Sequence, residues 1–356
     1  MKKHNFNAGP AVLPASVLEK AAQSVLELDG IGLSLLEISH RSAQFSAIMD
    51  QAVQIVKDLL HLGDAYEVLF LTGGASSQFF MVPLNLLGPN EKACYVDSGT
   101  WASKAIKEAG RYGKVEVIAS SKAAGYTHIP KNYAIPSDAK YLHLTSNNTI
   151  YGTQYHAFPE TEVPLVSDMS SDIMSRPVDV RPFGLIYAGA QKNIGPAGTT
   201  LVIVRKDMLG TIERDIPSML DYRNHASNNS LYNTAPVFPI YVSLLTLQWI
   251  RDLGGLDAME KRNRAKQELL YSEIDANPLF KGRCVPEDRS WMNVAFDATN
   301  PELEAEFLAT CKAAGIEGIK GHRSAGGFRA SIYNALELES VQVLVDVMRD
   351  FAAKKG

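Results

Sequence analysis

The sequence predicts an α/β protein built on a mostly parallel sheet, with a second domain, and two observations support this prediction. Short apolar runs of strand length alternate with helical patterns along the first part of the chain. Alternation of this kind is typical of a parallel sheet with helices packed on both faces. The chain has 356 residues. A single hydrophobic core rarely extends over so many residues, so a second domain is expected.

Two helices are expected before the sheet begins. Ser16 and Glu19 form a capping-box pattern that opens a helix ending at about residue 28. A second helical pattern covers residues 43–62 and ends at Gly63. The expected strands occupy residues 67–71, 93–96, 114–118, 141–144, 165–167, 184–188 and 199–204, with helical patterns at 76–87 and 101–109 between the first of them.

A long helical pattern then runs from about residue 238 to 276, broken by a Gly-Gly pair, and is expected to link two domains. The last part of the chain reads as a small α+β domain, with strands at 292–297 and 328–333 and helices at 302–314 and from 338 onward. We therefore expect a large domain over residues 16–257. The small domain is expected to comprise residues 258–356 together with the N-terminal segment 1–15.

Composition and charge argue against several function classes. The formal net charge is −4 and no basic block occurs, so neither nucleic acid nor a membrane surface is an expected partner. No apolar run approaches the ~18 residues of a membrane-spanning helix, and the N-terminal M-K-K-H-N-F-N-A-G-P lacks the apolar stretch of a signal peptide. The three cysteines and eight histidines lack disulfide or metal-ligand spacing, so we expect no metal and a cytoplasmic location.

The most informative segment is I-Y-A-G-A-Q-K-N-I-G-P-A-G-T-T-L-V-I-V, in which Lys192 follows an apolar strand and precedes a glycine-rich turn. Asp168 ends an earlier strand-like segment, P-L-V-S-D-M-S-S-D. The carboxyl ends of parallel strands meet at one edge of a sheet, where ligands bind. A lysine and an aspartate at that edge can hold pyridoxal 5'-phosphate (PLP), the lysine as a Schiff base and the aspartate against the pyridine nitrogen. A surface lysine is the ordinary alternative, but Asp168 and the small residues around Lys192 argue against it.

Three further turns could contact such a cofactor. The turn L-T-G-G-A-S-S-Q-F-F opens a helix, so Ala75 and Ser76 could bind a phosphate, although a purely structural turn has the same pattern. It is neither a P-loop nor a G-x-G-x-x-G turn. Trp101 follows Y-V-D-S-G-T and could stack on a planar ring, or it could be a core residue. Thr149, in S-N-N-T-I-Y-G-T, could donate to the cofactor or lie in an Asn-rich turn.

Two arginine-rich segments point to anionic substrates. E-I-S-H-R-S carries His40 and Arg41, and H-R-S-A-G-G-F-R-A-S carries His322, Arg323 and Arg329. Arginine binds carboxylate or phosphate through two parallel hydrogen bonds. Arg329 has small and apolar neighbours on an expected strand, which suits the α-carboxylate of an amino acid. The two His-Arg pairs would suit a second anionic group, and solvated loop arginines are the alternative for both pairs.

Together these segments resemble the phosphoserine aminotransferases, which belong to the class V pyridoxal-phosphate enzymes. Ordered blocks carry the resemblance along nearly the whole chain: F-N-A-G-P-A-V-L-P, S-H-R-S, G-G-A-S-S-Q-F, D-S-G-T-W, S-D-M-S-S, A-G-A-Q-K-N-I-G-P-A-G, Y-N-T-A-P and H-R-S-A-G-G-F-R-A-S-I-Y-N-A. The resemblance implies the type I aminotransferase fold, with a seven-stranded, mostly parallel sheet in the large domain. It also implies a homodimer whose active sites are shared between the subunits.

The resemblance further implies a role for each site residue. Lys192 would carry PLP and Asp168 would pair with its ring nitrogen. The remaining expected cofactor contacts are Trp101 on the ring, Thr149 and Gln191 at polar groups, and Ala75 and Ser76 at the phosphate, together with Asn233 and Thr234 of the other subunit. By its pattern alone, the segment that carries Asn233 and Thr234 is only a helix start.

The implied reaction is reversible transamination between L-glutamate and a phosphorylated 2-oxo acid. 3-Phosphohydroxypyruvate would give O-phospho-L-serine, and a four-carbon phosphorylated oxo acid of pyridoxine synthesis is a second possible substrate. Arg41 and Arg329 are expected at substrate carboxylates, with His40 beside Arg41, and His322 and Arg323 near the phosphate. Some members carry an arginine where this chain has Ser76, so other residues must complete the phosphate site here.

Three rival functions are weaker on the sequence. A cysteine desulfurase needs a reactive cysteine near the cofactor, and Cys94, Cys284 and Cys311 lie in ordinary strand or small-domain contexts. An alanine–glyoxylate aminotransferase has no use for a second His-Arg pair. A non-catalytic binding module that keeps the fold would be expected to lack the lysine or the aspartate, and both are present.

Overall fold

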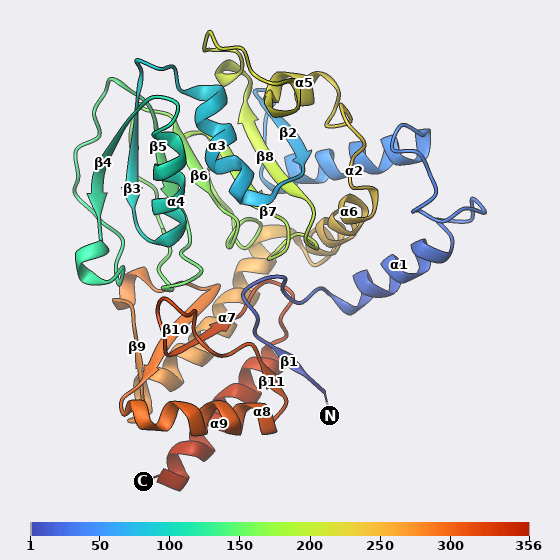
Figure 1. The fold of residues 1–356 in the computed structure, drawn as a ribbon. Helices are drawn as coiled ribbons and strands as arrows, with labels where there is room; N and C mark the ends of the chain where they lie inside the picture. The colour runs from blue at the N-terminus through green and yellow to red at the C-terminus, as the bar shows by residue number, and fades with distance from the viewer. Residues whose placement is uncertain (1, 356) are drawn as a thin grey trace.

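The computed structural model describes residues 2–355, and its centre is a seven-stranded sheet (Figure 1). The strands lie in the order β2-β8-β7-β6-β5-β3-β4. Strand β8 is antiparallel to both of its neighbours, and all other adjacent pairs are parallel. The predicted α/β fold with a mostly parallel sheet of seven strands is therefore confirmed. The strands are β2 (Tyr66–Leu71), β3 (Lys92–Asp97), β4 (Lys114–Ser120), β5 (Ala139–Thr145), β6 (Leu165–Asp168), β7 (Phe183–Gly189) and β8 (Thr200–Arg205).

Helices cover both faces of the sheet, because successive side chains of a strand point to opposite faces. In β2, Val68 and Phe70 pack into one core with α2 and α6, whereas Leu69 and Leu71 pack into a second core with α3 and α4 (Figure 1). The helices of this part are α1 (Ala15–Leu26), α2 (Ala43–Leu59), α3 (Gly74–Leu86), α4 (Thr100–Ala109), α5 (Tyr222–Ser227) and α6 (Val237–Asp252), with short 3-10 helices η1 (Lys122–Ala124), η2 (Lys206–Met208) and η3 (Ser218–Leu220).

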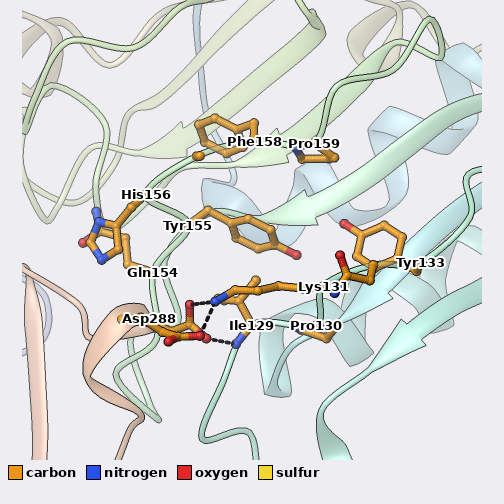
Figure 2. A pocket seen from close by; sticks show the side chains of 13 residues that line it. Ile129, Pro130, Lys131, Tyr133, Gln154, Tyr155, His156, Phe158, Pro159 and Asp288 are labelled. Atoms are coloured by element: carbon orange, nitrogen blue, oxygen red, sulfur yellow. Dashed lines mark hydrogen bonds and ion pairs between the residues drawn. The ribbon is translucent and has the colours of Figure 1, made fainter.

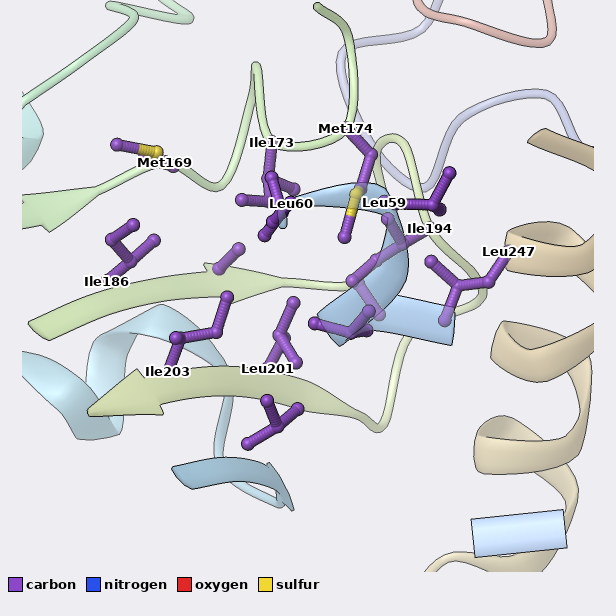
Figure 3. Packing of buried hydrophobic residues seen from close by; sticks show 14 of the residues in the cluster. Leu59, Leu60, Met169, Ile173, Met174, Ile186, Ile194, Leu201, Ile203 and Leu247 are labelled. Atoms are coloured by element: carbon purple, nitrogen blue, oxygen red, sulfur yellow. The ribbon is translucent and has the colours of Figure 1, made fainter. Parts of the chain in front are cut away.

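The core on the α2 side also anchors the two segments that carry Asp168 and Lys192. Met169 directly follows the aspartate, and Ile194 lies two positions after the lysine; both side chains are buried in this core (Figure 3). Burying an aliphatic side chain of this size stabilises the fold by about 1.5–3 kcal/mol. The backbone on which the chemistry depends is therefore held by apolar packing.

The C-terminal part of the chain holds a separate, smaller core around a three-stranded antiparallel sheet in the order β12-β10-β9. Helix α7 joins the two cores, since Leu256 and Met259 lie in the first and Leu270 and Ile274 in the second. The short strand β1 (His4–Asn5) pairs with β11 (Ile316–Glu317) of this part. The remaining elements are α7 (Gly255–Ala276), β9 (Phe280–Gly282), η4 (Pro286–Asp288), β10 (Asn293–Ala298), η5 (Pro301–Leu303), α8 (Glu304–Ala313), β12 (Phe328–Ser331) and α9 (Leu338–Lys355). The domain limits at residues 16 and 258 stay predictions.

One local prediction was wrong. Helix α1 begins at Ala15 behind Pro14, which occupies the N-cap position without a side-chain hydrogen bond, so Ser16 lies inside the helix instead of capping it. The fixed φ of proline suits the entry to a helix without a capping side chain. Within residues 2–355, no helix is long and apolar enough to cross a membrane, and no cluster of three or more metal-binding side chains occurs.

Candidate active site

A cavity of about 350 Å³ opens at the carboxyl ends of the sheet strands. Asp168 ends β6, and Lys192 follows the end of the neighbouring strand β7, so the two side chains reach the cavity from adjacent strands. The turn after β2 and the loop after β5 enter it from either side. Nine residues predicted from the sequence line this cavity: Ala75, Ser76, Trp101, Thr149, Asp168, Gln191, Lys192, His322 and Arg329.

The environment of Lys192 makes its amine reactive near neutral pH. Enclosure in the cavity lowers the lysine pKa to about 8, with Arg329 acting in the same direction and the Asp168 carboxylate opposing both. The ammonium group donates to Thr149 Oγ1 over 2.7 Å, which fixes its position. A lysine in this state is a competent nucleophile and proton acceptor.

Asp168 is held by its own strand end. The side chain is 5% exposed, and Oδ1 accepts hydrogen bonds from Ser170 N (2.9 Å) and Ser170 Oγ (2.6 Å). Burial raises the pKa of Asp168, whereas the Ser170 bonds and the nearby Lys192 act against this rise. Oδ2 makes no hydrogen bond within the part of the chain that the structure describes, which leaves it free for a cationic partner in the cavity.

The turn after β2 presents unpaired backbone amides to the cavity. Gly73 has a φ of +96°, and a Cβ there would lie 2.0 Å from Ser77 Oγ, so only glycine fits. Helix α3 starts at Gly74, which leaves the N–H groups of Gly74, Ala75 and Ser76 without partners inside the helix. Such a helix start is suited to binding a phosphate group.

Trp101 supplies a flat wall in the first turn of α4. Its indole lines the cavity, and the buried Nε1–H has no hydrogen-bond partner within residues 2–355. The Lys104 ammonium lies 4.5 Å from the centre of the Trp101 ring. An indole face, a helix start with unpaired amides, and the Asp168 and Lys192 side chains in one cavity together fit the ring, the phosphate and the aldehyde carbon of PLP.

Cationic side chains lie in the cavity and around His322. Arg329 donates from Nη1 to the Thr149 carbonyl over 3.1 Å, and its buried Nε has no partner within the described chain. Burial lowers the pKa of His322, and the positive charges of Arg329, Arg323 and Lys104 lower it further. Among residues 2–355, none of these three cations forms an ion pair with a carboxylate. Unpaired cations at one place are suited to a ligand that carries several negative charges.

Five predicted residues do not line the cavity of this single chain: His40, Arg41, Arg323, Asn233 and Thr234. Asn233 and Thr234 lie in the partly exposed segment before α6, where Asn233 Nδ2 donates to the Thr234 carbonyl. Arg41 is exposed at the start of α2. Their roles stay predictions.

Two residues of the site were missed in the sequence. Ser170 binds Asp168, and the signal was the serine two positions after an aspartate, a spacing at which side chain and backbone readily bond. Lys104 lies one helical turn after Trp101, so its position over the indole follows from the i, i+3 spacing of a helix.

Comparisons with known proteins agree with this geometry. The model of the aminotransferase class-V family matches residues 3–344. A curated protein named phosphoserine aminotransferase from Flavobacterium psychrophilum is 61% identical over 99% of this chain and 100% of its own length. Its namesake from Flavobacterium johnsoniae is 59% identical over the same shares of the two chains.

Solved structures extend the similarity to three dimensions. The phosphoserine aminotransferase of Bacillus circulans subsp. alkalophilus has a TM-score of 0.97 and 47% identity, covering 100% of this chain and 99% of that one. A PLP-bound phosphoserine aminotransferase of Trichomonas vaginalis has a TM-score of 0.92 and 37% identity, covering 98% of this chain and all of that one. An alanine–glyoxylate aminotransferase from Nostoc sp. shares the fold alone, at 16% identity and a TM-score of 0.76. The chain belongs to the aminotransferase class-V family.

Proposed function

We propose that this chain is a PLP-dependent phosphoserine aminotransferase. It would exchange the amino group between L-glutamate and 3-phosphohydroxypyruvate, giving 2-oxoglutarate and O-phospho-L-serine in L-serine biosynthesis. The observation that carries the proposal is Lys192, whose lowered pKa and bond to Thr149 lie in one cavity with Asp168 and an unpaired Arg329. The full-length similarity to enzymes of this name supports it further.

The residues of the cavity would hold PLP at each of its functional groups. Lys192 would bond its aldehyde carbon, Asp168 Oδ2 its ring nitrogen, and the amides of Ala75 and Ser76 its phosphate. Trp101 would cover the ring face, with Thr149 and Gln191 at its polar edge. When bound, PLP supplies a ring that accepts the electron pair released at the substrate's α-carbon.

Lys192 and Asp168 then have separate tasks. At a pKa of about 8, a substantial fraction of Lys192 Nζ is neutral near pH 7–8, so it can take the α-proton of the amino acid and return it elsewhere on the reacting group. The Asp168 carboxylate would stabilise a proton on the ring nitrogen of bound PLP. Thr149 Oγ1 keeps Nζ at the position from which the proton is moved.

The cationic side chains in the cavity and around His322 would select the substrate. Arg329 would bind the α-carboxylate that all four substrates and products share. His322 and Arg323 would bind the phosphate, and Lys104, whose ammonium lies over Trp101 and acts on His322, would add positive charge near them. Arg41, with His40 beside it, would bind a substrate carboxylate.

A homodimer would complete the site. Apolar side chains on and after α1 are exposed, among them Leu26 at 76% and Leu36 at 60%, as expected of a surface that a second copy covers. The same copy would bring Asn233 and Thr234 to the cofactor phosphate. A cytoplasmic location is supported by cysteines that form no disulfide within residues 2–355.

A cysteine desulfurase remains a poor fit. Burial raises the pKa of both Cys284 and Cys311 to about 12 and that of Cys94 by a smaller amount, so none of these thiols is poised as a nucleophile. None of the three lines the cavity that holds Lys192.

The test is a half-reaction titration of the PLP-loaded protein. Its visible absorbance is followed as O-phospho-L-serine, L-glutamate and L-alanine are added separately. Conversion by the first two and little by alanine would support the proposal. Conversion by alanine alone would keep the cofactor and overturn the substrate, and no cofactor band after reconstitution would overturn the enzyme assignment.

A further inference from the structure

A second cavity, of about 380 Å³, lies where the two domains meet and shares no lining residue with the active-site cavity (Figure 2). We call it the seam pocket. Three segments form it: residues 129–133 before β5, residues 154–159 between β5 and β6, and Glu287 and Asp288 of η4. Neither the proposed reaction nor the homology assigns it a role.

The seam pocket is fixed by contacts that cross between the domains. The Asp288 carboxylate accepts from the Ile129 amide (2.8 Å) and pairs with the Lys131 ammonium (2.8 Å), as the dashed lines in Figure 2 mark. The Gln154 backbone N–H donates to the Asp288 backbone carbonyl over 2.9 Å. The walls of the seam pocket are therefore preformed, as those of ligand pockets usually are.

Aromatic rings make one wall flat. Tyr155 is stacked on Phe158 with ring centres 5.9 Å apart and planes inclined by 7°, and Phe158 meets the buried Phe183 edge-on at 4.9 Å. Pro130 and Tyr133 add further apolar surface. A wall of this kind favours a planar ring as ligand.

Two polar atoms of the pocket walls are poorly paired. Tyr155 is 4% exposed, and Figure 2 shows its hydroxyl turned toward Tyr133. Burial raises the pKa of Tyr155 and the neighbouring Tyr133 raises it further, so the two side chains interact, although the Tyr155 hydroxyl forms no hydrogen bond of normal geometry within residues 2–355. His156 Nε2 donates to the Arg289 carbonyl over 2.9 Å, so in the neutral ring Nδ1 is an acceptor, and it too is buried without a partner in that range. Buried polar groups normally have partners, and both atoms have almost no accessible surface, so a ligand bonds them only when the Tyr155 or His156 side chain turns toward it.

The charge of the pocket limits that ligand. Lys131 is the only cation among the lining residues, and it is paired with both Glu287 (2.7 Å) and Asp288 (2.8 Å), which leaves one negative charge in excess. Burial lowers the pKa of His156, the bond to the Arg289 carbonyl opposes this, and the positive charges of Arg176 and Arg264 behind the wall lower the pKa further, so the ring is neutral at physiological pH. An anion is therefore disfavoured, in contrast to the active-site cavity.

We propose that the seam pocket is an effector site for a small, neutral or cationic aromatic molecule that bears a hydrogen-bonding group. A chain of hydrogen bonds runs from Gln154 in the wall of the seam pocket to the backbone carbonyl of Asp168. Gln154 Nε2 donates to Asp172 Oδ2 over 3.1 Å, Asp172 is bonded to Ser146 Oγ, and Ser146 N donates to the Asp168 carbonyl over 3.0 Å. Occupation of the pocket is transmitted along this chain to Asp168, a step that rests on the proposed cofactor role of Asp168.

The binding test uses isothermal titration calorimetry on the PLP-loaded protein. The probe is 3-(dimethylaminomethyl)indole, a planar cation whose tertiary amine cannot condense with PLP. We expect it to bind with a Kd below about 1 mM, and indole-3-acetate, which has the same ring and a negative charge, at least about tenfold more weakly. Equal binding of the two indoles, or no binding of the cation, overturns the site.

Matched variants locate the binding. Ala157 is exposed and lines the pocket, so the larger side chain of Ala157→Trp should fill it and abolish binding. Glu160 is also exposed but does not line the pocket, so Glu160→Trp should leave binding unchanged. Tyr155→Phe should weaken binding about five- to tenfold through the loss of one hydrogen bond. Unchanged binding to Ala157→Trp overturns the assignment.

The effect of ligand binding in the seam pocket on Asp168 is measured separately. Saturation with the cationic indole should shift the pH midpoint of the visible absorbance of the PLP-loaded protein, and Ala157→Trp should remove that shift. Binding without a shift refutes the transmission to Asp168. Calorimetry on the cofactor-free protein distinguishes these outcomes from failure of the proposed function, because the seam pocket needs no PLP.

Discussion

Arg329→Lys tests the substrate site without removing a charge. Arg329 lies in β12, where the backbone pairing of its strand with β10 is independent of the side chain, so the variant should fold. One guanidinium nitrogen bonds the Thr149 carbonyl, and the buried Nε is left for a ligand. Lysine keeps the positive charge but lacks the planar fork that binds both oxygens of a carboxylate.

The expected magnitude follows from the loss of one charge-assisted hydrogen bond, about 1.5–3 kcal/mol. That is about a 10- to 150-fold fall in kcat/KM. Both amino-acid half-reactions should fall by the same factor, because L-glutamate and O-phospho-L-serine each carry an α-carboxylate. Single-turnover absorbance measurements with each substrate give the two values.

Arg323→Lys is the matched comparison. Arg323 is exposed outside the cavity lining, and its proposed partner is the substrate phosphate. Its conservative variant should therefore slow O-phospho-L-serine more than L-glutamate. A selective loss of phosphoserine turnover in Arg329→Lys, with L-glutamate unaffected, would mean that Arg329 binds the phosphate and not the shared carboxylate.

Four further outcomes are expected. Lys192→Ala should abolish the cofactor's visible band and all turnover, and retained transamination would contradict its role. Burial lowers the pKa of Lys192 to about 8, so its neutral amine accumulates as the pH rises through that value. The rate at which cofactor-free protein captures PLP should therefore rise with pH, with a midpoint near 8. A midpoint at the ordinary lysine pKa of about 10.4 would show that burial does not lower the pKa of Lys192. Asp168→Asn should lower kcat with PLP still bound, measured by turnover of the reconstituted variant, and unchanged kcat would remove the ring-nitrogen role. Gly73→Ala should lower the free energy of unfolding by about 1–3 kcal/mol in urea titrations, since its φ of +96° strains any side chain.

Much of the site was predictable because strand ends can be read locally. The apolar runs that end before Asp168 and Lys192 place both residues at one edge of a parallel sheet, whatever the rest of the chain does. The small-residue turn before α3 likewise predicts a helix start at the same edge, where a phosphate could bind, although a purely structural turn has the same pattern. These features depend on periodicity and turn chemistry within a few residues.

Other features depend on distant parts of the chain and escaped prediction. The direction of β8, the pairing of β1 with β11 and the seam pocket are set by which apolar faces meet during folding. The sequence by itself determined the chemical identity of the site, a lysine and an aspartate at neighbouring strand ends. Only the tertiary structure decided how reactive that lysine is, because its pKa depends on enclosure by segments far away in the chain, among them the one that carries Arg329.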